Sequence, residues 1–412
     1  MPALLRGGSL ILPDRVVEDG ALLIDDAGRI AAAGPAAGKE APGRAAEIDL
    51  GGRLVAPGFI DLHCHGGGGA DFMDGTAEAF RTVLEAHLRH GTTTLAPTTT
   101  VAVHEQILAA LETCARAVRA GGFGLFDEGR GAGSRVAGAH FYGPYFGPGA
   151  HGCHPAEPVR APVPEEFEAY LAFGGLPEGG AIACATVAPE VPGAEAFARA
   201  ARRRGIRIHA GHSNATLSQV EASLAWGVGH VDHLFCAMSD KTKLRREEPW
   251  PMRAGLLEAA LLLDELSTEV IADGVHLDAG LLRLAYRTKG PDRLALVSDC
   301  NRALDRPDGE YLFGPEAGGE PFVRRGGVCM PPDGGGPASS CQGMDHMVRT
   351  FRELTGAPLP EVVRMASLTP ARILGIDARA GSLEAGKIAD LLVLDEGLRL
   401  ERLFLQGREI VL

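Results

Sequence analysis

The sequence predicts an α/β protein, a (β/α)8 TIM barrel with a small β-sandwich domain built from both chain termini. The length of 412 residues accommodates a barrel of roughly 250 to 320 residues and a smaller partner. Eight strand-like runs, most of them followed by a helical pattern, occupy residues 55–374. Short apolar runs between turn residues occupy residues 1–54 and return in residues 375–412. We therefore assign the two terminal segments to the sandwich and the central segment to the barrel.

The terminal segments carry turn signals at hairpin spacing. Pro13-Asp14, Asp25-Asp26 and Gly34-Pro35 separate the apolar runs of the first segment. At the other end of the chain, residues 389–394 and 402–405 are predicted strands. Neither segment has enough strands to close a core of its own, so we expect the two segments to pair with each other.

The central elements follow in order. Residues 59–66 form an apolar strand that ends in a glycine cluster. Thr76 can cap a helix that ends near Gly91. Further helices are expected over about 102–120 and about 344–374. The other seven strands are predicted at residues 92–98, 136–144, 182–190, 207–214, 229–235, 268–276 and 294–300.

The links after the third, sixth and eighth strands are long and rich in glycine, proline or charge. Long loops at the carboxyl end of a barrel usually build its active site. The glycine-rich residues 333–337 are predicted to be a flexible loop, because they lack the lysine and the flanking residues of a phosphate-binding loop.

Composition narrows the class of protein. Hydrophobic residues make up 45% and charged residues 23%, as in soluble globular proteins. The net charge of −13 argues against nucleic acid or an anionic membrane as a partner. No apolar stretch is long enough to span a bilayer, and the N-terminus lacks the apolar core of a signal peptide. The eight cysteines show no C-x-x-C spacing, which indicates reduced thiols and a cytoplasmic location.

Side chains that can bind a metal lie at the ends of several predicted strands. His63 and His65 are two residues apart on one strand and therefore point the same way. Two adjacent imidazoles suit a borderline-soft ion such as zinc. Each residue alone has a structural explanation, such as a hydrogen-bonded histidine or an aspartate cap. Their recurrence at the end of a barrel where the strands converge predicts a metal-dependent active site. The set comprises His63, His65, His212, His233, His276 and Asp299.

Other residues of the same types are given structural roles. His140 and His230 lie within strands and are assigned to the core or to loops. The cysteines beside the motifs are interpreted as small buried side chains rather than as ligands. They are Cys64, Cys153, Cys236 and Cys300.

Motifs across most of the chain resemble the amidohydrolase superfamily and, within it, the N-acetylglucosamine-6-phosphate deacetylase family. As a set they are highly specific for the superfamily and moderately specific for the deacetylase branch. These motifs are residues 57–66, 91–98, 188–190, 211–216, 233–238, 273–276, 296–299, 367–372 and 381–390.

The resemblance implies metal-assisted hydrolysis of the amide of an N-acetylated amino sugar, N-acetylglucosamine-6-phosphate or a related sugar. Asp299 would accept the proton of the attacking water and pass it to the leaving amine. His154 matches the histidine that polarises the carbonyl and would stabilise the oxyanion. His276 and the backbone near Ala237 are candidates for holding the sugar. The resemblance also implies a homo-oligomer, a dimer or larger.

Three positions depart from the family pattern. The family's third strand carries Leu-Glu-Gly-Pro, whose glutamate binds metal, and this chain has Tyr142 in its place. Cys236 replaces an asparagine that helps to hold the sugar phosphate. The arginine that reaches the phosphate across a subunit interface has only approximate counterparts, Arg245 and Arg246. The first departure concerns the number of metal ions, and the other two concern the phosphate. We predict that the phosphate contributes little.

The ligand count predicts one divalent ion, and the imidazole ligands predict that this ion is zinc. Without a carboxylate at position 142, a second ion would have only two protein ligands, His212 and His233. The first ion would instead recruit His212 beside His63, His65 and Asp299 and leave His233 to bind the attacking water or the oxyanion. The alternative is that Cys153, Glu157 or another nearby group replaces the missing glutamate.

Two other functions stay open at this point. The chain could be a different amidase of the same superfamily, such as an N-acyl-amino-acid hydrolase. It could also be a barrel that has lost catalysis and serves in binding, a reading that the missing glutamate favours. The retention of His63, His65, His212, His233 and Asp299 argues against the second possibility.

Overall fold

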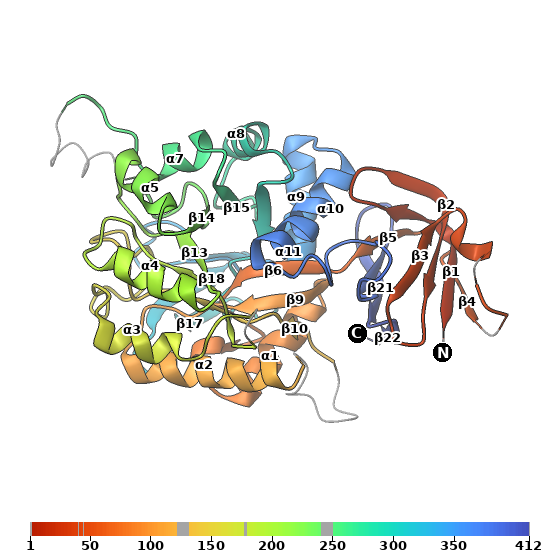
Figure 1. Cartoon of the computed structure of the whole chain (residues 1–412), viewed down its shortest axis with the longest axis horizontal. Coiled ribbons are helices and arrows are strands. Elements are labelled where there is room, and N and C mark those ends of the chain that lie inside the picture. The colour runs from red at the N-terminus through yellow and green to blue at the C-terminus, as the bar shows by residue number, and fades with distance from the viewer. Residues whose placement is uncertain are drawn as a thin grey trace.

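The computed structural model describes residues 2–39, 41–43, 45–121, 132–176, 179–239 and 250–411. Two groups of strands organise these residues. Strands from both ends of the chain share one sheet, and the segment between them forms parallel strands covered by helices (Figure 1).

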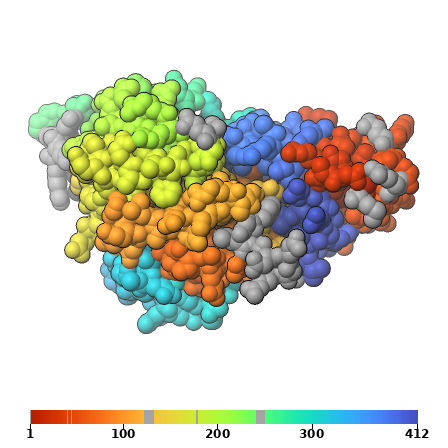
Figure 2. Space-filling view, turned by 60° about the horizontal axis from the view of Figure 1, so that its bottom comes forward, coloured from red at the N-terminus to blue at the C-terminus, as the bar shows by residue number. Residues whose placement is uncertain are grey.

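The sheet of the chain ends contains the strands that the sequence predicted at both termini. Its order is β22-β21-β20-β5-β1-β2-β3, with β4 paired to β1. In the space-filling view, the two ends of the chain lie together at one side of the molecule (Figure 2). The strands are β1 (Ala3–Ile11), β2 (Val16–Ile24), β3 (Ile30–Gly34), β4 (Ala46–Asp49), β5 (Leu54–Pro57), β20 (Leu391–Leu394), β21 (Leu400–Leu405) and β22 (Arg408–Ile410). Since β5 belongs to this sheet, the chain leaves it at Gly58, a few residues later than the sequence boundary at residue 54.

All eight predicted central strands are present, the third as two short strands, β10 and β11, and every pair among them is parallel. They form one sheet of order β10-β9-β6 and another that runs from β11 to β16. A parallel bridge between Thr98 and His140 joins β9 to β11, and the amide of Asp299 donates to the carbonyl of His63 at 2.9 Å. The two sheets therefore meet at both edges, and their carboxyl ends lie on one rim. The strands are β6 (Phe59–Cys64), β9 (Thr92–Pro97), β10 (Arg135–Val136), β11 (Ala139–Phe141), β12 (Ile182–Thr186), β13 (Arg207–Ala210), β14 (Val228–Val231), β15 (Ser267–Ile271) and β16 (Leu294–Val297).

Helices follow most of these strands, as the sequence predicts. Oγ1 of Thr76 accepts from the amide of Ala79 at 3.1 Å and caps the first helix. The helices are α1 (Ala77–Leu88), α2 (His104–Arg119), α3 (Pro164–Leu171), α4 (Ala194–Arg203), α5 (Leu217–Leu224), α7 (Leu256–Leu262), α8 (Ala279–Lys289), α9 (Met344–Thr355), α10 (Leu359–Ala366) and α11 (Leu368–Leu374). Within the described ranges, no helix has the length and apolar character needed to cross a membrane.

The link after β16 differs from the sequence prediction of a loop. It contains an antiparallel sheet of β17 (Gly309–Phe313), β18 (Glu320–Arg325) and β19 (Val328–Met330). Tyr311 packs on Phe322 with ring centroids 5.7 Å apart, and this contact gives the small sheet an apolar face. These strands are short, so their alternation of apolar and polar residues spans few positions. The glycine and proline residues of the link therefore favoured the prediction of a loop. The other short elements are η1 (Ala37–Lys39), β7 (Gly66–Gly67), β8 (Ala70–Asp71) and η2 (Phe72–Asp74).

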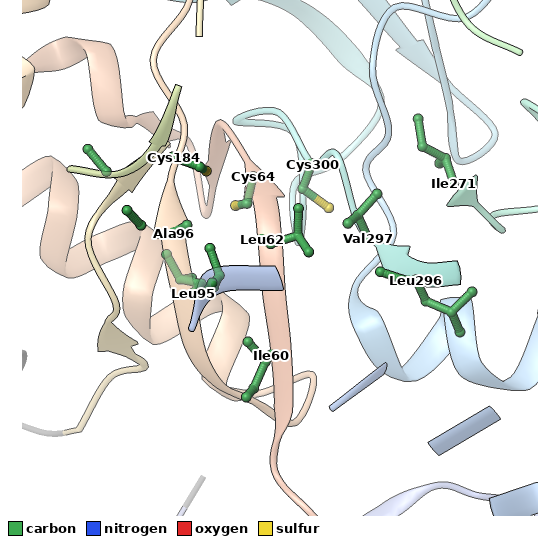
Figure 3. Packing of buried hydrophobic residues seen from close by; sticks show 14 of the residues in the cluster. Ile60, Leu62, Cys64, Leu95, Ala96, Cys184, Ile271, Leu296, Val297 and Cys300 are labelled. Carbon is green, nitrogen blue, oxygen red and sulfur yellow. The ribbon is translucent and has the colours of Figure 1, made fainter. Parts of the chain in front are cut away.

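Apolar side chains of neighbouring parallel strands pack into one buried cluster. Ile60 and Leu62 of β6, Leu95 of β9 and Leu296 of β16 belong to this cluster (Figure 3). Cys184 of β12 lies in the same cluster (Figure 3). This packing holds the strands in a fixed order, so the residues just past their carboxyl ends have fixed positions as well.

Candidate active site

His63 and His65 lie side by side where β6 ends. Both side chains are buried, and their ring centroids are 5.3 Å apart. Nδ1 of His63 donates to Oε1 of Glu269 at 2.6 Å. Its Nε2 is buried and has no hydrogen-bond partner among the described residues. A carboxylate behind a histidine fixes the tautomer whose other nitrogen binds a metal, so His63 has the environment of a ligand.

Glu269, on β15, was missed by the sequence reasoning. Burial lowers the pKa of His63, but the charge and hydrogen bond of Glu269 outweigh burial and raise the pKa of His63 to about 9. An ion bound at Nε2 would displace the proton that this nitrogen otherwise carries at neutral pH. Glu269 also accepts from Nε2 of His230 and from the backbone amide of His233, both at 3.1 Å. The signal was present in the sequence, because a carboxylate within a buried strand needs polar partners.

Asp299 follows β16 in a left-handed backbone conformation, with φ of 46°. Burial favours the neutral carboxyl, but the hydrogen bond from His65 and the nearby histidine charges hold the pKa of Asp299 well below its usual range. Ser339 donates to this residue, with its Oγ 3.2 Å from Oδ1. Asp299 is therefore a carboxylate at neutral pH, as both a ligand and a proton acceptor must be.

The ligand atoms of His63, His65 and Asp299 all lie within 4.8 Å of one another. Oδ1 of Asp299 is 3.8 Å from Nε2 of His63 and 3.4 Å from Nε2 of His65. Tetrahedral ligands with bonds of about 2.1 Å stand roughly 3.4 Å apart, so this spacing suits a small divalent ion. His212 is outside this group, so the fourth ligand expected from the sequence is not part of the cluster.

His212, His233 and Tyr142 contact one another instead. Nε2 of His233 lies 3.2 Å from Nε2 of His212 and 2.5 Å from Oη of Tyr142. Nδ1 of His212 donates to the carbonyl of Ala150 at 2.6 Å, so Nε2 of His212 carries no proton and has a lone pair. Nε2 of His233 is therefore shared between Nε2 of His212 and the phenol of Tyr142.

Tyr142 does not replace a carboxylate. Its side chain is fully buried, and burial raises the pKa of Tyr142 well above that of a free phenol. Of the two substitutes considered from the sequence, Cys153 lines the pocket, but burial raises the pKa of its thiol as well. Glu157 is exposed and does not line the pocket. Tyr142 and Cys153 are therefore neutral at neutral pH unless an ion displaces their proton, and Glu157 lies outside the pocket.

His154 lies in the same pocket, 5.0 Å from the ring of His212 and 5.8 Å from that of His65. Burial and then the charge of His212 hold the pKa of His154 well below its usual range, so the ring is neutral. Nδ1 accepts from the amide of Val101 at 3.4 Å. The proton is therefore on Nε2, where it can be donated to a substrate oxygen.

The remaining predicted substrate residues divide into two groups. His276, Cys236 and Ala237 all line the pocket, and Nδ1 of His276 lies 2.8 Å from Oδ2 of Asp273. Arg246 lies outside the described residues. Phe313 was not predicted, because it arrives from the small antiparallel sheet. The pocket has a volume of about 420 Å³ and is lined by His65, Tyr142, Gly152, Cys153, His154, His212, His233, Phe235, Cys236, Ala237, Ile271, His276, Asp299, Phe313, Pro331, Gly335, Gly336, Pro337 and Ser339.

Similarity to known proteins covers the whole chain. An N-acetylgalactosamine-6-phosphate deacetylase of Escherichia coli O157:H7 is 33% identical over 408 residues, which are 99% of each chain. An N-acetylglucosamine-6-phosphate deacetylase of Vibrio furnissii is 31% identical over 95% of this chain and 90% of its own.

Solved structures give the same result. An N-acetyl-D-glucosamine-6-phosphate deacetylase of Mycobacterium smegmatis, in complex with N-acetyl-D-glucosamine-6-phosphate, aligns over 100% of both chains with a TM-score of 0.86 and 30% identity. The deacetylase of Pasteurella multocida aligns over 100% of both chains with a TM-score of 0.87 and 27% identity. The amidohydrolase family pattern itself matches residues 54–409. The chain therefore belongs to the amidohydrolase family, in the branch that contains the N-acetylglucosamine-6-phosphate deacetylases.

Proposed function

We propose that this chain hydrolyses the acetamide of an N-acetylated amino sugar phosphate, with N-acetylglucosamine-6-phosphate and N-acetylgalactosamine-6-phosphate as the sugars to test first. The observation that carries the proposal is the convergence of His63, His65 and Asp299 at the pocket that His65, Asp299 and His154 line. The relatives named for these two substrates support the choice of sugars.

The finer architecture belongs to the same proposal. The parallel strands β6 to β16 would close a (β/α)8 barrel over residues 58–374, with the sheet of residues 1–57 and 375–412 as the small β-sandwich domain. Contacts at both edges of the two parallel sheets support closure. The rim that carries His63 and Asp299 would then be the mouth of the barrel, where active sites of this architecture lie.

The donor set fits one divalent ion, and we take zinc as its identity. Nε2 of His63, the adjacent His65 and the anionic Asp299 would be the three protein ligands of a catalytic site that keeps an open position. Such an ion lowers the pKa of a water towards about 7. His212 and His233 would bind the attacking water or the oxyanion, because Tyr142 fills the place of a second set of ligands.

The side chains then perform the remaining steps. Asp299 takes a proton from the attacking water and delivers it to the nitrogen as the C–N bond breaks, which releases acetate and a free amine. Nε2 of His154 donates to the carbonyl oxygen as it gains negative charge. His276, held by Asp273, would donate to a sugar hydroxyl, and Tyr142, Cys236 and Ala237 would shape the rest of the sugar site.

A panel of substrates tests the proposal. Release of free amine should be fastest from the N-acetylhexosamines and their 6-phosphates, and at least 100-fold slower from N-acetylated amino acids. Faster cleavage of the amino acids would favour the other amidase. No turnover with any amide, in zinc-loaded protein, would favour a binding protein. A homo-oligomer and a cytoplasmic location remain proposals, which sedimentation and cell fractionation would test.

A further inference from the structure

A second group of metal-type side chains lies below the pocket, on the inner side of the parallel strands. His140 of β11, Cys184 of β12 and His209 of β13 come from three neighbouring strands, and their ligand atoms all lie within 4.8 Å of one another. All three side chains are at most 1% exposed. None of them takes part in the chemistry proposed for the pocket.

Hydrogen bonds fix the tautomers of both imidazoles. The hydroxyl of Thr186 donates to Oδ2 of Asp232 at 2.6 Å, so Nε2 of His140, 2.8 Å away, must donate to Thr186. Nδ1 of His209 donates to Oδ1 of Asp232 at 3.1 Å. The remaining ring nitrogens, Nδ1 of His140 and Nε2 of His209, therefore carry no proton and each has a free lone pair. Both are buried and have no hydrogen-bond partner among the described residues.

Charge gives a second, independent argument. Asp232 is fully buried, and in the described part of the chain it forms an ion pair with the ring of His209 but with no arginine or lysine. A buried carboxylate without a cation is costly. A divalent ion bound to the thiolate of Cys184 would place net positive charge near this carboxylate.

We propose that His140, Cys184 and His209 bind a zinc ion inside the protein, separate from the ion of the pocket. Each imidazole offers its free nitrogen, at bonds of about 2.1 Å, and sulfur binds at about 2.3 Å. Binding releases the thiol proton to solvent and leaves a thiolate–zinc bond. Asp232, behind His209, is the carboxylate that usually supports a histidine ligand. The ion ties three adjacent strands together, so its role is structural.

Burial predicts how the two ions differ in exchange. The pocket ion faces a cavity of about 420 Å³ and should leave quickly when a chelator is added. The inner ion has no such opening and should enter as the chain folds. Chelator-treated native protein should therefore retain one zinc per chain, whereas protein refolded with chelator should contain none.

Cobalt provides the direct readout, because a thiolate bound to Co²⁺ gives a charge-transfer band in the near ultraviolet. Protein refolded with Co²⁺ should show this band and hold two ions per chain. Cys184→Ala should lose the band and one ion and keep the pocket ion. The matched control is Cys114→Ala, which removes another buried thiol and should change neither. Cys153→Ser, which alters the pocket thiol, should also keep the band.

The alternative to a zinc ion is a buried water molecule that donates to both nitrogens and accepts from the thiol. One ion per chain and no thiolate band in refolded wild-type protein would establish the water and overturn the proposal. That measurement needs no variant, so it decides the matter even if Cys184→Ala fails to fold. Two ions retained in folded Cys184→Ala would place the second ion in the pocket and would overturn both this site and the one-ion pocket.

Discussion

Oη of Tyr142 lies 2.5 Å from Nε2 of His233, and this contact joins the end of β11 to the end of β14. The phenol is neutral and is hydrogen-bonded to one of the two histidines that a second ion would need. We therefore propose that the identity of this one residue sets the number of ions that the pocket binds.

Restoring the carboxylate should restore the second ion. Tyr142→Glu is expected to raise the metal content by one equivalent per chain over wild type, because it supplies a third ligand beside His212 and His233. Tyr142→Phe is the control and should leave the content unchanged. The measurement is the metal content of both variants after dialysis, by elemental analysis. Equal metal content in the two variants would contradict the prediction that the missing carboxylate limits the pocket to one ion.

Asp299→Asn should remove turnover while the protein stays folded. Loss of general acid–base catalysis alone costs about 10²- to 10⁴-fold, and loss of a metal ligand adds to that. Asp305→Asn serves as the control, because Asp305 lies in the same link and pairs with Arg89 and His90 outside the pocket. Amine release and circular dichroism are the measurements. Activity of Asp299→Asn within tenfold of wild type would exclude Asp299 from the mechanism.

Glu269→Gln should act through the metal rather than through the substrate. The variant keeps the shape but loses the charge that orients His63, and such supporting residues typically change metal affinity by about 10- to 100-fold. Activity should fall at limiting zinc and recover with excess zinc, with KM unchanged. A loss that zinc cannot rescue would assign Glu269 a role other than positioning.

The 6-phosphate should contribute little to selectivity. No arginine or lysine lines the described part of the pocket, and the thiol of Cys236 is a weak donor. We expect less than a tenfold preference in kcat/KM for the phosphorylated sugar, about 1.4 kcal/mol. Cys236→Asn should increase that preference. A preference in the thousands that Arg246→Ala abolishes would contradict the prediction.

His90 should make the stability depend on pH. Burial opposes its charge, but the hydrogen bonds that His90 donates to Asp305 and Asp345, each 2.9 Å long, raise the pKa of His90 to about 9 from 6.5. Its hydrogen bond to Asp305 in turn lowers the pKa of that carboxyl to about 2. A raised histidine pKa stabilises the fold below pH 6.5, and this contribution is lost as pH rises through about 9. The aspartate contribution is lost as pH falls through about 2.

The measurement is the thermal midpoint of wild type and His90→Gln at several pH values. The variant should melt several degrees lower near pH 5.5, and the difference should shrink above pH 9. A difference that stays constant over this range would mean that His90 contributes by packing alone.

Local patterns in the sequence predicted most of the elements, but they missed β17 to β19 and the contacts between elements. His63, His65 and Asp299 were recognisable because each sits where an apolar run stops, and parallel strands bring such ends together. The link between Glu269 and His63 joins residues 206 positions apart, so no local pattern reveals it. The same holds for Tyr142. The sequence alone shows that residue 142 has no carboxylate to bind an ion. The hydrogen bond between Tyr142 and His233, however, depends on how β11 and β14 face each other.

The pairing of β5 with β20 governs the order in which the chain can fold during synthesis. β5 lies between β1 and β20, and the amide of Gly58, just after it, donates to the carbonyl of Asp390. The ribosome makes the whole catalytic segment between these two strands. Until β20 emerges, β5 presents an unpaired edge, which is a template for wrong association. The last strands thus protect the first, and a chain that stops before residue 391 should aggregate even though every residue of the pocket has already been made.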